Sequence, residues 1–219
     1  MFDINKIKHI IFDMDGTLVD TDPVYENGWR FAFKQYGFDV EDQVIESWSG
    51  FSVEASTQAV TEIVGNRDLA LEIRGIREEY FYNELKSGEV KLMPYVLELF
   101  EHLKQKNITI NLATSTHEEK GTEILRQLGV DNYIEHKVFG NYVKESKPSP
   151  EIYQLMIHRL MASKSDSLVV EDSITGVNAA ISAQLSVIML PYRPLLSNPY
   201  ANHKNVIIQR DLKSILDII

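Results

Sequence analysis

The hydrophobic pattern of the chain alternates between short continuous apolar runs and longer stretches in which apolar residues recur every three or four positions. The short runs predict buried strands, and they lie at 10–12, 108–113, 137–139, 168–170, 187–190 and 206–208. Helical spacing between the later runs is found at 97–104 and 124–128. Strands that alternate with helices indicate an α/β fold with a Rossmann-like parallel sheet. Ligands of such sheets bind beyond the carboxyl ends of the strands.

The interval between the first and second runs is helical in character throughout. It spans roughly ninety residues, far more than a crossover connection needs. Helical spacing is found within it at 25–36, 53–64 and 68–85, separated by breaks that contain glycine. We therefore predict an inserted all-helical cap domain at 20–92. The Rossmann-like core domain would consist of 1–19 and 93–219.

Composition limits the class of protein. The 219 residues are 44% hydrophobic and 25% charged, as in ordinary soluble globular proteins. The absence of cysteine excludes disulfides, thiolate catalysis and zinc–thiolate sites. The sequence has no apolar stretch long enough to cross a bilayer and no signal peptide pattern at its start. We expect a cytoplasmic protein that has no membrane partner, and the sequence is compatible with a monomer.

The negative charge is concentrated in the predicted helical domain. The net charge of the chain is −10, and residues 20–92 hold 15 acidic against 7 basic residues. Such a segment repels nucleic acid over a Debye length of about 8 Å. A polymeric nucleic acid is therefore disfavoured as a partner, although a solvated helical surface would have the same composition.

Two acidic residues follow the first apolar run. The run 10–12 leads into Asp13 and Asp15, and Gly16 then lets the chain turn sharply. Two carboxylates at a buried strand end cost free energy, because like charges repel and both groups are desolvated. A divalent cation would offset this cost, and the pair also offers a nucleophile with an acid beside it. An acidic surface turn would give the same local sequence.

Hydroxyl groups follow the second predicted strand. Thr114, Ser115 and Thr116 come directly after the run 108–113. Thr116 and Glu119 have capping-box spacing, which predicts that a helix begins there. Main-chain N–H groups and hydroxyls at a helix start bind phosphate readily. A simple helix cap is the alternative interpretation.

A lysine precedes another predicted helix start. Ser149 can cap this helix and Pro150 can occupy its first position, so Lys147 is held just ahead of it. A lysine fixed there could neutralise a phosphoryl group together with a nucleophilic carboxylate. An exposed loop lysine is the alternative, and Lys144 is a competitor that lacks the proline context.

Adjacent acids end the fourth predicted strand. Glu171 and Asp172 follow the run 168–170, Ser173 is placed to cap a helix, and Gly176 would let that helix approach closely. Acids at two separate strand ends are suited to an octahedral Mg²⁺ site. A capping acid beside a solvated neighbour would give the same pattern.

These four clusters occur in order, each at a strand end or helix start, and together they carry a resemblance. The chain resembles the phosphatases of the haloacid dehalogenase superfamily, in the subgroup with a helical cap inserted after the first strand. This subgroup includes β-phosphoglucomutase-like and phosphoglycolate phosphatase-like proteins. The similarity covers essentially the whole chain, and it rests on Asp13–Thr17, Thr114, Lys147–Pro148 and Glu171–Asp172.

The resemblance implies a two-step phosphoryl transfer. Asp13 would attack phosphorus and form an aspartyl-phosphate, while Asp15 would protonate the leaving oxygen and then activate water. Thr114 and the Ser115 amide would hold phosphate oxygens, and Lys147 would balance charge. The substrate class is a small phosphorylated metabolite, namely a sugar, polyol or nucleoside monophosphate.

The resemblance also implies a Mg²⁺ cofactor. Its ligands would be the Asp13 side chain, the Asp15 main-chain carbonyl and the Asp172 side chain. Glu171 would support the cation directly or through water.

The helical cap would select the leaving group of the substrate. Candidate substrate-binding residues in it are Tyr25, Trp48, Ser49 and Phe51. Their alternative role is aromatic packing inside the cap. His117 is interpreted as a residue at a helix start.

Two alternatives to hydrolysis remain open at this level. Sugar-phosphate mutases of the β-phosphoglucomutase type share the core, but they typically carry basic residues on the cap loop, and 47–53 contains neither Lys nor Arg. Thr17 also matches the phosphatases better. A non-catalytic regulator that binds a phosphorylated ligand would be expected to lack Asp13 or Asp15, and both are present.

Overall fold

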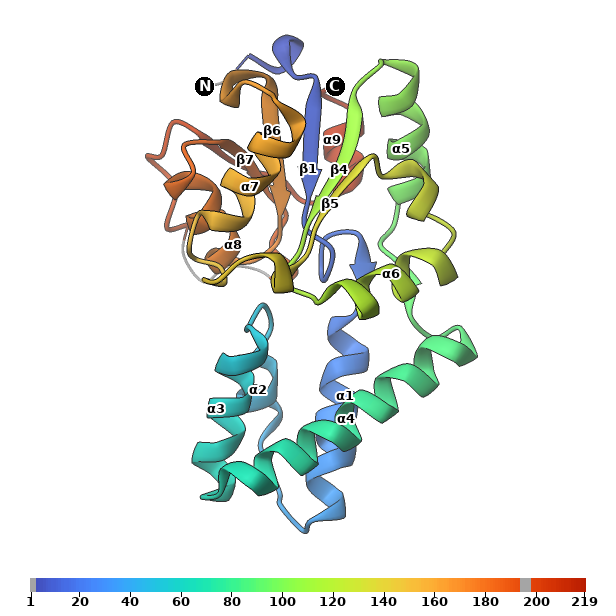
Figure 1. Cartoon of the computed structure of the whole chain (residues 1–219), viewed down its shortest axis with the longest axis vertical. Coiled ribbons are helices and arrows are strands. Elements are labelled where there is room, and N and C mark those ends of the chain that lie inside the picture. Colours follow the sequence, from blue (N-terminus) through green and yellow to red (C-terminus); the bar gives the residue numbers. More distant parts are fainter. Residues whose placement is uncertain (1–2, 194–197) are drawn as a thin grey trace. The chain divides into compact units, whose positions relative to one another are not determined.

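The structure is a computed structural model that describes residues 3–193 and 198–219 (Figure 1). It contains two compact units, of which the second is Asp20–Lys91 and the first comprises the chain before and after that segment. Two short strands, β2 (Val19–Asp20) and β3 (Lys91–Leu92), pair where the chain passes between the units. Among the described residues, no helix has the length and apolar character needed to span a membrane.

The first unit is built on a six-stranded parallel sheet with the order β5-β4-β1-β6-β7-β8. Its strands are β1 (His9–Phe12), β4 (Thr109–Ala113), β5 (His136–Val138), β6 (Ser167–Glu171), β7 (Ser186–Met189) and β8 (Val206–Ile208). The register places Ile10 opposite Ile110 and Leu168. Each strand lies within one residue of its predicted run, and the predicted α/β class is confirmed.

Helices cover both faces of this sheet (Figure 1). The helices α5 (Val96–Gln105) and α9 (Leu212–Leu216) lie together on one face, where the Phe12 ring packs 5.6 Å from that of Phe100. The helices α7 (Glu151–Leu160) and α8 (Ile174–Ser182) cover the other face, where Ile152 and Val177 pack with Ile11. Further helical segments are α6 (Glu118–Gln127) and the 3₁₀ turns Ile4–Lys6, Asp131–Tyr133, Gly140–Tyr142 and Lys164–Asp166.

The second unit is all-helical apart from the strand residues at its ends. Its helices are α1 (Asp22–Gln35), α2 (Asp42–Glu46), α3 (Val53–Val64) and α4 (Arg67–Ser87), and α1 and α3 both pack on α4. Ser52 and Asn66 cap α3 and α4 through their side chains, and Gly65 ends α3 in the left-handed region that glycine tolerates. An apolar cluster that includes Trp29 and Phe33 fills its interior.

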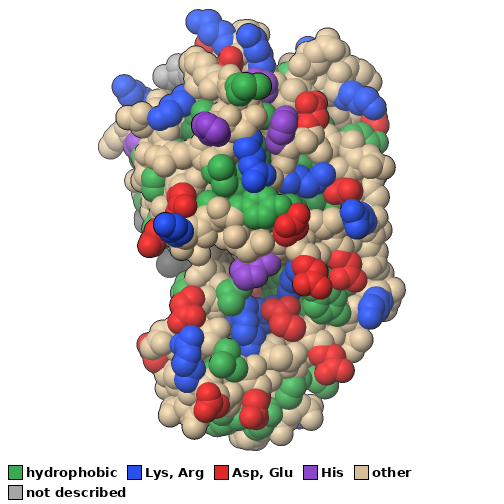
Figure 2. All heavy atoms as spheres, viewed as in Figure 1, with side chains coloured by type: hydrophobic (Ala, Val, Ile, Leu, Met, Phe, Trp, Pro, Cys, Tyr) green, Lys and Arg blue, Asp and Glu red, His purple; other side chains and the backbone are tan. Residues whose placement is uncertain are grey.

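Charged side chains of both signs lie on the surface. Acidic and basic groups are interspersed on the side of the molecule drawn in Figure 2. In the helical unit, Arg67 pairs with Glu54 at 3.0 Å and Arg30 pairs with Asp42 at 2.5 Å. Exposed pairs of this kind contribute at most about 1 kcal/mol each to stability. The charge pattern therefore bears on solubility more than on the fold.

Candidate functional site

Acidic residues from two neighbouring strands meet at the carboxyl edge of the sheet. Asp13 follows β1, and Asp172 follows β6, whose last residue is Glu171. One carboxylate oxygen from each of these three residues lies within 4.8 Å of the other two. All three residues are buried, at 7%, 8% and 0% exposure for Asp13, Asp172 and Glu171. Parallel strands bring these ends together because their carboxyl ends share one edge.

Lys147 lies in the loop before α7 and inserts its ammonium group into this cluster. Its Nζ donates to Asp13 Oδ1 at 2.5 Å, to Glu171 Oε1 at 2.7 Å and to the main-chain carbonyl of Ala113 at 3.1 Å. An ammonium group has three donors, so all of them are used. The Lys147–Pro148 peptide bond is cis. Lys144, in contrast, is exposed.

Glu171 is surrounded by donors from the protein itself. Its Oε1 accepts from Lys147 Nζ and from the Tyr153 hydroxyl, at 2.7 and 3.1 Å. Its Oε2 accepts from the main-chain N–H of Asp172 and from the N–H and hydroxyl of Ser173, each at 3.0 Å. Ser173 also caps α8 by accepting from the Gly176 N–H, as predicted. Sequence reasoning gave Tyr153 no role, because its contact with Glu171 exists only in the folded chain.

Glycines make room for these carboxylates. A Cβ at Gly176 would lie 1.6 Å from Glu171 Oε1, and one at Gly16 would lie 2.4 Å from Asp172 Oδ2. Neither position could accept a larger residue without displacing the carboxylate. The close approach expected at Gly176 is thus confirmed. Thr17, next to Gly16, donates its hydroxyl to Asp172 Oδ1 at 3.3 Å.

Thr114 and Ser115 lie at the end of β4, at the same edge of the sheet. Thr114 is buried, and its hydroxyl accepts from the Thr116 N–H at 3.1 Å, which leaves its own proton available to donate. A Cβ at Gly140 would lie 2.1 Å from the Ser115 carbonyl oxygen, so that position requires glycine. Sequence reasoning missed Gly140, which lies in a different segment and has no local signal for this role.

Asp15 accepts a hydrogen bond from Thr116, a residue that was predicted to cap a helix. The Thr116 hydroxyl donates to Asp15 Oδ2 at 2.7 Å, so it does not cap a helix. The predicted capping box of Thr116 and Glu119 is wrong, because α6 begins at Glu118 with His117 at the N-cap and no capping bond from that side chain. Asn141 provides the bond instead, since its Oδ1 accepts from the Glu118 N–H at 2.9 Å.

The electrostatics of the cluster favour a positive ligand. Burial raises the pKa of Asp13 to about 8, and the charges of Glu171 and Asp15 act in the same direction, while Lys147 opposes them. Burial alone would lower the pKa of Lys147, but Asp13 and Glu171 outweigh it and hold that pKa well above its ordinary value. One ammonium group therefore faces more carboxylates than it can neutralise. A hard divalent cation fits this set of oxygen donors.

The raised pKa of Asp13 predicts a pH-dependent stability in the absence of divalent cations. Between its ordinary pKa of 3.8 and about 8, the folded chain holds a proton that the unfolded chain has lost. Stability due to this group therefore falls as pH rises through that window. In EDTA, Asp13→Asn should raise the melting temperature more at about pH 9 than at about pH 5. An equal difference at both pH values would contradict this assignment.

The predicted substrate-binding residues of the helical unit differ in their surroundings. Trp48 is 8% exposed and packs edge-on against Trp29 at 5.6 Å, as a core residue does. Tyr25 stacks on Phe81 at 4.7 Å. The Ser49 hydroxyl donates to Asp22 Oδ2 at 2.5 Å. Phe51 is 45% exposed, and Ser49 is exposed as well.

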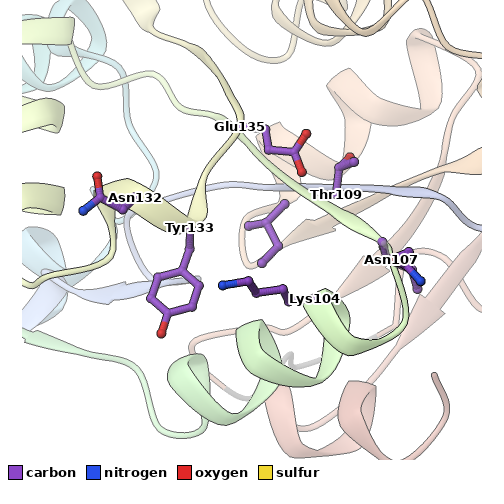
Figure 3. A pocket seen from close by; sticks show the side chains of 8 residues that line it. Lys104, Asn107, Thr109, Asn132, Tyr133 and Glu135 are labelled. Carbon is purple, nitrogen blue, oxygen red and sulfur yellow. The ribbon is translucent and has the colours of Figure 1, made fainter.

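A pocket of about 440 Å³ lies away from the acidic cluster, at the amino end of β4 (Figure 3). Lys104, Thr109, Tyr133 and Glu135 are among its lining residues, and the Lys104 ammonium lies 5.9 Å from the centre of the Tyr133 ring. None of the predicted site residues lines it. The pocket is therefore separate from the acidic cluster.

Comparisons with known proteins agree with this geometry. Residues 10–190 match the family described as haloacid dehalogenase-like hydrolase. The phosphorylated carbohydrates phosphatase of Thermotoga maritima is 37% identical over 180 residues, which are 80% of each chain. The (DL)-glycerol-3-phosphatase 2 of Arabidopsis thaliana is 31% identical, over 85% of this chain and 80% of that protein. The structure of CbbY from Rhodobacter sphaeroides, in complex with phosphate, shares the fold with a TM-score of 0.74 at 24% identity, covering 92% and 93% of the chains.

Proposed function

Because the chain belongs to the haloacid dehalogenase-like hydrolase family and is a phosphatase, we propose that it hydrolyses a small phosphomonoester with Mg²⁺ as cofactor. The reaction passes through an aspartyl-phosphate on Asp13. The substrate is a sugar, polyol or nucleoside monophosphate, and the relatives named for phosphorylated carbohydrates and glycerol-3-phosphate support the first two classes. The observation that carries the proposal is the Asp13–Lys147 pair beside Asp172 at the carboxyl edge of the sheet.

In the first step, an Asp13 carboxylate oxygen attacks phosphorus and the bond to the leaving oxygen breaks. Asp15, oriented by Thr116, gives its proton to that oxygen. In the second step, Asp15 takes a proton from water, the water oxygen bonds to phosphorus, and the Asp13–phosphorus bond breaks. The products are the free alcohol and inorganic phosphate, and both aspartates return to their initial states.

The remaining residues bind and neutralise the phosphoryl group. The Thr114 hydroxyl and the main-chain N–H of Ser115 would donate to phosphoryl oxygens. Lys147 balances the charge of Asp13 before attack and of the phosphoryl group during transfer. Magnesium, when bound, would neutralise the carboxylates and polarise the phosphoryl oxygens. The Asp13 and Asp172 side chains and the Asp15 carbonyl are its proposed ligands.

The proposed function is tested by a screen of the pure protein with Mg²⁺ against a panel of sugar, polyol and nucleoside monophosphates. We expect release of inorganic phosphate from at least one class, and none in EDTA. Conversion of a sugar phosphate into its isomer without phosphate release would establish a mutase instead. No turnover of any compound by the metal-loaded protein would contradict the proposed function and favour a non-catalytic protein that binds a phosphorylated ligand.

The metal assignment predicts a thermal effect that does not depend on turnover. Saturating Mg²⁺ should raise the melting temperature of the wild-type protein by about 5 °C, since a ligand at 100 times its Kd stabilises by about 2.7 kcal/mol. Asp172→Ala should lose this shift and raise the Mg²⁺ requirement of turnover sharply. Asp217→Ala, which removes an exposed acid that pairs with Lys213, is the matched control and should keep it. If Mg²⁺ raised the melting temperature of Asp172→Ala as much as that of wild type, Asp172 would not be a ligand of the cation.

A further inference from the structure

We propose that Tyr153 is a positioning residue for this reaction and that it acts through Glu171, whose own role is to hold Lys147 and not to bind the cation. The inference rests on the proposed function. It also assigns Glu171 a narrower role than the resemblance implied, and it gives a role to Tyr153, to which the sequence analysis assigned none.

Tyr153 connects the first turn of α7 to the acidic cluster. Its side chain is fully buried, and its hydroxyl donates to Glu171 Oε1 at 3.1 Å. The Lys147 ammonium lies 5.1 Å from the centre of its ring, within the range of a cation–π contact. Tyr153 therefore contacts both partners of the Lys147–Glu171 ion pair.

The hydrogen bonds of Glu171 leave little capacity for a metal ion. A carboxylate offers about four lone-pair positions. Glu171 receives five donors, two at Oε1 and three at Oε2, from Lys147, Tyr153, Asp172 and Ser173. Direct coordination would require breaking at least one of these bonds in a fully buried site, where an unsatisfied donor is costly.

The bonds form a chain that ends at the nucleophile. Tyr153 fixes Glu171, Glu171 fixes Lys147 at 2.7 Å, and Lys147 lies 2.5 Å from Asp13. Without the Tyr153 hydroxyl, Glu171 Oε1 would keep Lys147 as its donor among the described hydrogen bonds, so the positions of that oxygen and of the ammonium group would be less well fixed. The ammonium group would then be less well placed during phosphoryl transfer, where positioning dominates the rate.

Tyr153→Phe tests this role because it removes the hydroxyl and keeps the buried ring. We expect kcat to fall about tenfold with KM changed by less than about twofold, as is typical when an outer partner of a catalytic group is lost. Tyr200→Phe is the matched control. Tyr200 is 8% exposed in the same apolar cluster, and its hydroxyl donates to Asn178 at 2.9 Å. It should keep the wild-type kcat. Equal kcat values in the two variants would overturn the proposal.

A double-mutant cycle separates positioning through Glu171 from a general packing effect. In a Glu171→Gln background, Tyr153→Phe should change kcat by less than about twofold, because residues that act in one network are not additive. A tenfold loss in both backgrounds would show that Tyr153 acts independently of Glu171 and would overturn the proposed route.

Whether Glu171 binds the cation can be tested without measuring turnover. Thermal titration with Mg²⁺ should give Tyr153→Phe and Glu171→Gln apparent affinities within about twofold of wild type, whereas Asp172→Ala loses the response. Loss of the response in Glu171→Gln would make Glu171 a ligand and overturn its assignment as an anchor. If the wild-type protein binds Mg²⁺ but releases no phosphate, the proposed function is wrong. The titration still decides in that case whether Glu171 binds the cation.

Discussion

Asp13→Asn is expected to lower kcat by at least about 10,000-fold, equivalent to roughly 5.4 kcal/mol of transition-state stabilisation. The amide is a poor nucleophile and cannot form the acyl phosphate through which the proposed reaction passes. The fold should be kept, because Lys147 retains the Glu171 carboxylate and the Ala113 carbonyl as acceptors. Steady-state phosphate release, measured with saturating Mg²⁺ on the best substrate of the panel, checks this loss.

The matched control for this change is Asp217→Asn, which makes the same substitution at an exposed acid that pairs with Lys213. It should be as active as wild type. Circular dichroism and the melting temperature should show a native fold for both variants. Activity of Asp13→Asn near the wild-type level would show that Asp13 is not the nucleophile.

Lys147→Met is expected to be the most damaging change in combined stability and activity. It leaves the carboxylates of Asp13 and Glu171 buried without their shared ammonium group. Removing one partner of a buried ion pair costs about 3–5 kcal/mol of folding stability. The loss of a preorganised charge at the phosphoryl group should also lower kcat by about 100- to 1,000-fold. Chemical denaturation and phosphate release measure the two effects separately.

The chain provides a close control for this prediction. Lys144→Met makes the same substitution three residues earlier in the same loop, where the side chain is exposed. It should change neither stability nor kcat by more than a surface substitution normally does, about 0.5 kcal/mol. If the two methionine variants behaved alike, Lys147 would have no special role in the cluster.

Secondary structure was predictable where the hydrophobic pattern was long or continuous. The strands of the parallel sheet and the long helices α3 and α4 follow directly from the spacing of their apolar residues. The helix α2, with five residues, and the two-residue strands β2 and β3 were not predicted. Segments so short contain less than two turns or a single pleat, so no period can be recognised in them.

The main chemical groups of the candidate site were also identifiable from the sequence. Acids at the ends of β1 and β6 are adjacent in space because those strands are neighbours in a parallel sheet. The short local strings around Asp13 and Asp172 include the glycines that accommodate the carboxylates. Each string was recognisable on its own, and the order of the strands in the sheet then brings the two strings together.

The supporting contacts were not predictable because they join distant segments. Thr116 bonds to Asp15, which is 101 positions away, instead of capping the helix that follows it. Asn141 caps α6 from 23 positions away. Local propensity describes what a side chain can do with its neighbours, and tertiary contacts then decide between the options. The contacts of Tyr153 with Glu171 and of Gly140 with Ser115 were missed for the same reason.

The most direct test of the account is whether Asp13 becomes phosphorylated. Asp15→Asn should still allow the first step with p-nitrophenyl phosphate, whose leaving group needs little protonation, but it should stall the hydrolysis that requires a base. We predict a burst of nitrophenolate stoichiometric with the protein, followed by slow turnover. After acid quenching, mass spectrometry should locate one phosphoryl group on the peptide that contains Asp13. Absence of both the burst and the modified peptide, in a variant that binds Mg²⁺ normally, would contradict the account.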